Sequence, residues 1–166
     1  TLYVIWKQVI RKYSTHTGDF VGEFEPAETK LAGISYYFDN FNTIVGCTES
    51  GDLINWNSQN GVITRKLKLK LEGDVKISTF HIVSTQLSSG KVLCQALLTY
   101  LDKTKNTIQL LLFDVESGVV VKSKAIDARA EYHVDVIGNC GNNLIAVAQD
   151  IDFHILQPQN DLEGKS

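Results

Sequence analysis

A repeated hairpin pattern constrains the fold of this chain more than any other feature of its sequence. Three segments align without gaps. In each, a strand-like run ends on an aromatic residue, a small polar residue follows, and glycine stands five positions after the aromatic. Glycine supplies the left-handed conformation that closes such a hairpin, and the polar residues can bond the turn backbone. The aromatic and glycine pairs are Tyr13 and Gly18, Trp56 and Gly61, and Phe113 and Gly118.

The rest of the chain favours an all-β fold. Runs rich in β-branched and aromatic residues recur between Gly, Asn, Asp and Ser, and no window keeps the apolar spacing of an amphipathic helix. Pro26 and Pro158 both fall between these runs, where a missing N–H costs no ladder bond. The sequence predicts strands at 2–6, 9–14, 20–24, 33–38, 43–47, 53–57, 62–70, 75–83, 91–100, 107–115, 119–126, 132–138, 143–149 and 153–156.

The spacing of the repeat indicates four-stranded units. The aromatics at positions 13, 56 and 113 recur near the period of about 40–45 residues that is typical of propeller blades, with one longer insertion. We therefore expect a single partial β-propeller domain over 1–166. Its parts are an incomplete blade at 1–25, complete blades at 31–71 and 75–127, an incomplete blade at 131–157 and a tail at 158–166.

The segment that ends on Trp56 carries a family resemblance. Residues 50–57 resemble the S-x-D-G-x-I-x-x-W-D stretch of the WD-repeat family. Asn57 replaces the family's Asp, and the Gly-His dipeptide expected ahead of the Trp is absent, so the Asp–His–Ser–Trp hydrogen-bond network of that family is not carried over. The resemblance implies degenerate blades of a WD40-type β-propeller.

A closer resemblance concerns residues 9–18 and the Trp56 repeat, which are similar to the N-terminal propeller of the WD repeat-containing protein seventy-five family, clearest over about 2–71. That resemblance implies a nuclear, nucleolar subunit of the small-subunit processome. Its role would be in pre-ribosomal RNA transcription and 18S ribosomal RNA maturation, with other propeller subunits and pre-ribosomal RNA as partners. The alternative is a scaffold of another protein-only assembly, such as a vesicle coat or nuclear pore.

Two complete blades are too few to close a ring, which takes four to eight. We expect the chain to be a fragment of a longer polypeptide, completed by the rest of that polypeptide or by another chain. Until then its end blades would present bare strand edges.

The sequence contains no pattern that indicates catalysis, a metal or a cofactor. The histidines and cysteines lack ligand spacing, and no G-x-S-x-G or phosphate-binding loop occurs. A net charge of −3 gives no global attraction to nucleic acid or membrane. We expect no enzyme activity, no small-molecule substrate and no membrane contact. The histidines are His16, His81, His133 and His154, and the cysteines, expected as buried thiols, are Cys47, Cys94 and Cys140.

One charged run stands out, because Arg65 is followed by Lys66, Lys68 and Lys70 in alternation with leucines. In a strand this alternation places the three lysines on one face. As the outer strand of a blade, the run would protect an edge from pairing with another sheet. The other interpretation is a strip that contacts RNA phosphates or an acidic partner.

Overall fold

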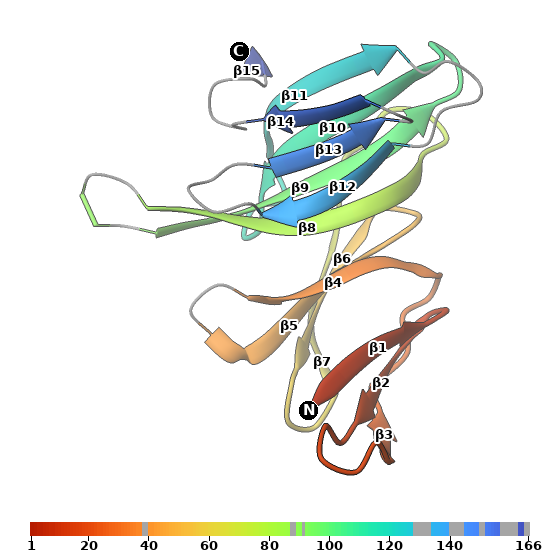
Figure 1. Ribbon diagram of the computed structural model, residues 1–166, viewed down its shortest axis with the longest axis vertical. Coiled ribbons are helices and arrows are strands. Elements are labelled where there is room, and N and C mark those ends of the chain that lie inside the picture. The colour runs from red at the N-terminus through yellow and green to blue at the C-terminus, as the bar shows by residue number, and fades with distance from the viewer. Residues whose placement is uncertain are drawn as a thin grey trace.

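The structure is a computed structural model that describes residues 1–37, 40–86, 89–90, 92–127, 134–139, 145–149, 152–156 and 163–164. These residues form strands and turns, and none of them is helical (Figure 1). The strands are β1 (Leu2–Trp6), β2 (Val9–Tyr13), β3 (Phe20–Glu23), β4 (Leu31–Tyr37), β5 (Asn40–Thr48), β6 (Asp52–Asn57), β7 (Ile63–Lys68), β8 (Lys76–Gln86), β9 (Val92–Asp102), β10 (Thr107–Asp114), β11 (Val120–Asp127), β12 (Val134–Asn139), β13 (Ile145–Gln149), β14 (Asp152–Leu156) and β15 (Glu163–Gly164).

Every strand that the sequence predicts is present, which confirms the all-β fold. The boundaries differ most at β5, which begins three residues earlier than predicted, and at β8, which ends three residues later. In the lysine run, β7 ends at Lys68 and leaves Lys70 in the following connection. Strand β15 lies in the segment that the sequence analysis treats as a tail, where it pairs with β11. Tyr132 and Asn143, which begin two of the predicted strands, and Cys140 of the predicted turn between them lie outside the described residues.

The strands form four separate antiparallel sheets that follow one another in chain order. The first sheet has the order β1-β2-β3, the second β4-β5-β6-β7, the third β15-β11-β10-β9-β8, and the fourth β12-β13-β14. In Figure 1 the first sheet lies at the lower end of the long axis, the second above it and the third towards the top. Strands β4 and β8, which begin the second and third sheets, lie side by side. This succession of meanders is the arrangement predicted for successive blades.

Two apolar cores lie between the sheets, one on each face of the second sheet. The core between the first and second sheets is built around Ile10, Ile54 and Trp56. The core between the second and third sheets contains Leu53 and Phe113. Since Ile54 and Trp56 face one core and Leu53 faces the other, β6 alternates between two neighbours, as its sequence predicts. The second sheet is therefore enclosed on both faces, which explains why Leu53, Ile54 and Trp56 of β6 are all apolar although they point to different faces.

Candidate interaction surfaces

Three hairpin turns share one geometry, and all six repeat residues take part in it. Gly18, Gly61 and Gly118 have φ angles of 76°, 71° and 70°, which confirms the predicted left-handed glycine. In each turn the glycine N–H donates to the carbonyl four residues earlier, at 2.8 Å in all three, where Ser14, Asn57 and Asp114 are the acceptors. The side chains of these three polar residues also accept turn N–H groups, as expected. The turns are therefore equivalent positions in three successive sheets.

The aromatic residues that precede these turns differ in burial. Trp56 and Phe113 are fully buried between neighbouring sheets, and Tyr13 of the first sheet is only half-buried. The Trp56 Nε1–H donates to the Glu25 carbonyl at 2.8 Å, so its indole links the second sheet to the segment that leaves the first. The aromatic thus anchors a sheet only where a preceding sheet is present.

The space around the three turn glycines shows the same difference in packing between the sheets. A Cβ built on Gly61 would lie 2.8 Å from Cδ1 and 3.0 Å from Cα of Phe24, so this turn rests directly on the end of the first sheet. A Cβ on Gly118 would lie 2.5 Å from Cδ2 of Leu67 in the second sheet. Around Gly18 no atom lies within 4 Å of such a Cβ. The turn of the first sheet therefore has the geometry of the other two but no neighbouring sheet to rest on.

Two polar residues hold adjacent sheets together, and the sequence analysis identifies neither role. Glu25 accepts the Ile63 N–H on its carboxylate at 2.8 Å, and its own N–H donates to the Gly61 carbonyl at 2.8 Å. Arg65 donates from Nη1 to the Val115 carbonyl at 3.1 Å and from Nη2 to the Glu116 carbonyl. Both residues come from the outer part of one sheet and bind the turn of the next. No sequence motif marks such contacts, because the partners lie far along the chain.

The cations of the lysine run therefore separate into different environments. Arg65 is half-buried and bonded to the third sheet. Lys66 forms an ion pair with Glu28 at 3.2 Å, and Lys68 forms one with Asp52 at 3.2 Å. Lys70 is exposed and forms no ion pair with a described residue. Neighbouring acidic side chains thus offset part of the positive charge on the predicted lysine face, and only Lys66 and Lys68 belong to β7.

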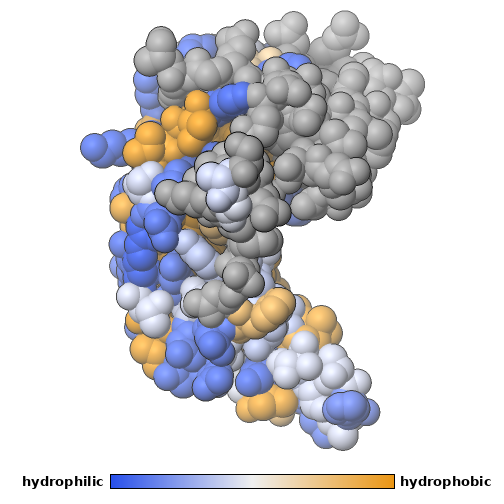
Figure 2. Space-filling model, turned by 90° about the vertical axis from the view of Figure 1, so that its left-hand side faces the viewer, coloured by the Kyte–Doolittle hydropathy of each residue, from blue (hydrophilic) through white to orange (hydrophobic). Residues whose placement is uncertain are grey.

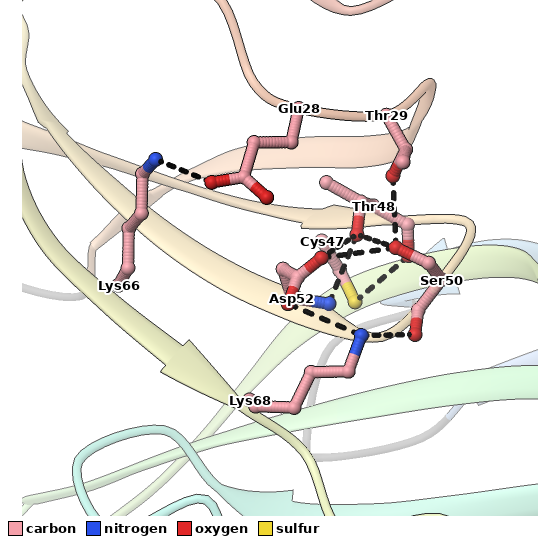
Figure 3. Close-up of polar contacts among 8 residues, drawn as sticks. All are labelled: Glu28, Thr29, Cys47, Thr48, Ser50, Asp52, Lys66 and Lys68. Carbon is pink, nitrogen blue, oxygen red and sulfur yellow. Dashed lines mark hydrogen bonds and ion pairs between the residues drawn. The ribbon is translucent and has the colours of Figure 1, made fainter.

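A polar cluster surrounds the turn between β5 and β6 (Figure 3). The Asp52 carboxylate accepts hydrogen bonds from the Ser50 and Thr48 hydroxyls, at 2.9 and 3.2 Å, and the Ser50 hydroxyl also meets that of Thr29 at 2.8 Å. Lys68 donates to the Ser50 carbonyl at 2.8 Å. Burial alone would raise the pKa of Asp52, but these hydrogen bonds and the Lys68 charge lower it below its usual value. The cluster is a closed network that stabilises the turn.

Possible nucleophiles and metal ligands are not assembled into a site in the described part of the chain. Burial raises the pKa of the Cys47 thiol to about 12, so it stays protonated, as expected for a core cysteine. Among the described residues there is no group of three histidine, cysteine or acidic side chains that could hold a metal ion. The same residues contain no helix long and apolar enough to cross a membrane. His133 and Cys140, which the sequence analysis considers, lie outside the described residues.

A polar cleft of about 320 Å³ lies where the second and third sheets meet. Lys70 and Glu72 line it from the connection between the sheets, and Tyr100, Asp102 and Lys105 line it from the third sheet. Burial, with the nearby Asp102 and Glu72 charges, raises the pKa of the Tyr100 hydroxyl. Because both signs of charge line the cleft, it favours neither an anionic nor a cationic ligand.

The outward face of the first sheet is apolar and exposed. Trp6 of β1 and Phe20 of β3 are 53% and 56% exposed, and Leu2 and Val21 have similar exposure. Ile44, the residue of the second sheet that is equivalent to Leu2, is buried in the core that faces the first sheet. Figure 2 shows hydrophobic residues on the surface of this lower, N-terminal end of the molecule. Several large apolar side chains on one sheet face are typical of a surface that another structure covers.

Comparison with solved structures identifies this architecture. The Dos1 propeller matches the chain with a TM-score of 0.62 and 13% identity, covering 96% of this chain and 41% of the other. The C-terminal WD40 domain of Sif2 matches with a TM-score of 0.50 and 14% identity, covering 88% and 38%. The chain has the fold of a partial WD40-type β-propeller. Its sheets are accordingly called blades below.

The chain spans only about two fifths of the length of these two propeller chains. No protein-family model and no curated protein sequence matches it. At 13% and 14% identity the likeness concerns the fold, and function has to be argued from the blades themselves.

Proposed function

We propose that the chain is part of a non-catalytic propeller scaffold that holds other proteins in a large assembly. The observation that carries the proposal is the contrast between the enclosed second blade and the open first blade. Trp56 is fully buried, whereas Trp6 and Phe20 of the first blade lie exposed on an apolar face. An exposed apolar face of this kind is typical of a surface that another part of an assembly covers.

The assembly that we propose is the nucleolar small-subunit processome. The support is the sequence resemblance of residues 9–18 and of the Trp56 repeat to a propeller family of that complex. In that role the chain contacts other propeller subunits and takes part in pre-ribosomal RNA transcription and 18S ribosomal RNA maturation. Pre-ribosomal RNA is a secondary contact, for which Lys66, Lys68 and Lys70 are the candidates.

The test is made in cells with the full-length protein carrying an affinity tag. The proposal expects nucleolar localisation, co-purification of processome propeller subunits with pre-ribosomal RNA, and accumulation of 18S precursors after depletion. A protein that stays outside the nucleolus and leaves 18S maturation unchanged on depletion would refute the processome assignment.

A specific observation favours a second candidate, a scaffold of a protein-only assembly such as a vesicle coat or nuclear pore. Lys66 and Lys68 are already paired with Glu28 and Asp52, which lowers their value as phosphate contacts. In the co-purification experiment this candidate expects protein partners without pre-ribosomal RNA. Replacing Lys66, Lys68 and Lys70 with Glu would then leave partner binding at low salt unchanged, whereas an RNA contact would weaken.

A further inference from the structure

We propose that Asn60 is a site of spontaneous deamidation that the folded turn between β6 and β7 holds closed. Asn60 is the only asparagine of the chain that is followed directly by glycine. Its side chain is exposed, and the turn that carries it rests on Phe24 at the end of the first blade. The reaction consumes only water, and it does not depend on the proposed scaffold role.

The chemistry follows from the glycine after Asn60. Asparagine is among the thermolabile residues, and glycine has no side chain to keep its backbone nitrogen away from the asparagine amide. After losing its proton, the Gly61 nitrogen attacks Cγ of Asn60, a C–N bond closes a succinimide ring, and the side-chain nitrogen leaves as ammonia. Water then opens the ring at either of its carbonyl carbons. The products are aspartate and isoaspartate, in which the main chain runs through the side chain.

Hydrogen bonds on both sides of Gly61 oppose this attack in the folded chain. The Gly61 N–H donates to the Asn57 carbonyl at 2.8 Å, so the nitrogen that would react keeps its proton. The Asn60 Oδ1 accepts the Val62 N–H at 3.1 Å, which fixes the side chain that would be attacked. The Gly61 carbonyl accepts the Glu25 N–H at 2.8 Å, which ties the glycine to the first blade. The turn therefore has to open before the ring can form.

The equivalent turns show that the closed geometry does not require an asparagine. Ser117 in the third blade and Thr17 in the first occupy the position of Asn60, directly before the turn glycine. Their hydroxyls accept the N–H two residues later at 3.2 and 3.3 Å, as the Asn60 side chain does at 3.1 Å. A hydroxyl cannot form the succinimide ring. Of these three turns, that of the second blade alone therefore carries a reactive side chain.

Isoaspartate at position 60 would disturb the junction between the first two blades. It adds a carbon to the main chain directly before Gly61, where a Cβ on the glycine would already lie 2.8 Å from Cδ1 of Phe24. The Gly61 carbonyl also accepts the Glu25 N–H, and the Glu25 carbonyl accepts the Trp56 indole N–H. Deamidation after a transient opening would thus keep the two blades from forming their native contacts again.

An ageing experiment on the full-length protein tests the proposal. The protein is kept in mildly alkaline buffer, either folded or unfolded in guanidinium chloride. The tryptic peptide 31–65 is then analysed by mass spectrometry, with fragmentation that locates the modified residue. We expect Asn60 to be converted at least about tenfold more slowly in the folded protein, because the turn has to open first. Equal rates in the two states, or no conversion of Asn60 in the unfolded protein, would overturn the proposal.

Variants test whether the junction between the blades controls the reaction. Trp56→Phe removes the indole hydrogen bond to the Glu25 carbonyl and is expected to speed the conversion of Asn60 several-fold in the folded protein. Trp6→Phe changes the exposed tryptophan of the first blade and is expected to leave the rate unchanged. Circular dichroism checks that both variants are folded. Equal rates in the two variants would contradict control by the junction.

The isoaspartate form tests the effect on the junction itself. It is refolded from the aged protein and separated from the unmodified form by ion exchange, and its isoaspartate content is measured with protein isoaspartyl methyltransferase. Asn60→Asp is the matched control, because it carries the same charge without the extra main-chain carbon and keeps an oxygen for the Val62 N–H. We expect the isoaspartate form to unfold at a lower denaturant concentration than Asn60→Asp. Equal unfolding midpoints would show that the turn tolerates the extra carbon and would contradict the proposed effect.

Discussion

Replacement of Trp56 tests the claim that the repeat aromatic anchors one blade to the next. The indole is fully buried between the first two blades, and its N–H donates to the Glu25 carbonyl at 2.8 Å. Trp56→Ala removes the whole ring from a core that can only partly collapse, which typically costs about 3–5 kcal/mol. Trp56→Phe keeps most of the apolar contact but loses the hydrogen bond, and we expect it to cost about 1–3 kcal/mol.

The chain provides a matched control in its other tryptophan. Trp6 is 53% exposed, and the Arg11 guanidinium lies over its ring, 4.7 Å from the centroid. Trp6→Ala should therefore cost less than about 1 kcal/mol. The free energies of unfolding are measured by urea denaturation with circular dichroism detection. A loss below about 1 kcal/mol for Trp56→Ala, or equal losses for the two tryptophans, would refute the anchoring role.

Three further predictions concern the turns and the charged residues. Arg65→Ala should lower the free energy of unfolding, measured by urea denaturation, by about 1–2 kcal/mol, because two carbonyls of the third blade lose their charged donor. Lys66→Ala breaks an exposed ion pair and should lower it by less than about 0.5 kcal/mol. Gly61→Ala should be more destabilising than Gly18→Ala by about 1–3 kcal/mol. Both glycines are left-handed, but only a Cβ at position 61 would clash with a neighbouring backbone. Equal melting temperatures of the two variants would contradict this. The pKa of Asp52 is lowered in the folded state, so its stabilisation is present at neutral pH and is lost as pH falls below about 4. The stability gap between Asp52→Asn and the wild type should accordingly narrow as the pH falls through the acidic range, and a gap that stays constant there would contradict the carboxylate network.

The sequence predicts the local features of this fold well. The turn that contains Gly61 and its equivalents is determined by a few adjacent residues, because a left-handed glycine and a polar side chain close the hairpin without help from the rest of the chain. Strand positions follow for the same reason, since side-chain alternation is a local property. The burial of Trp56 was also predictable, because an aromatic residue at the end of a central strand faces a neighbouring sheet.

Contacts between blades could not be predicted in the same way. Glu25 appears in the sequence as an ordinary acidic residue before a proline, yet it accepts one N–H, donates another and receives the Trp56 indole on its carbonyl. Arg65 is the first residue of the lysine run in the sequence, yet its guanidinium donates to the turn of the third blade. These roles depend on which turn rests on which strand, and the repeat period does not contain that information.

The lysine run shows why a charge pattern alone is a weak guide to a binding surface. Alternation correctly places Lys66 and Lys68 on the exposed side of β7, but it says nothing about acids that the fold brings close. Glu28 comes from the connection before the second blade and Asp52 from its central strand, and both approach to 3.2 Å. Each pairing removes part of the field that a phosphate would encounter. Any contact with RNA along this edge would therefore have to displace two ion pairs first.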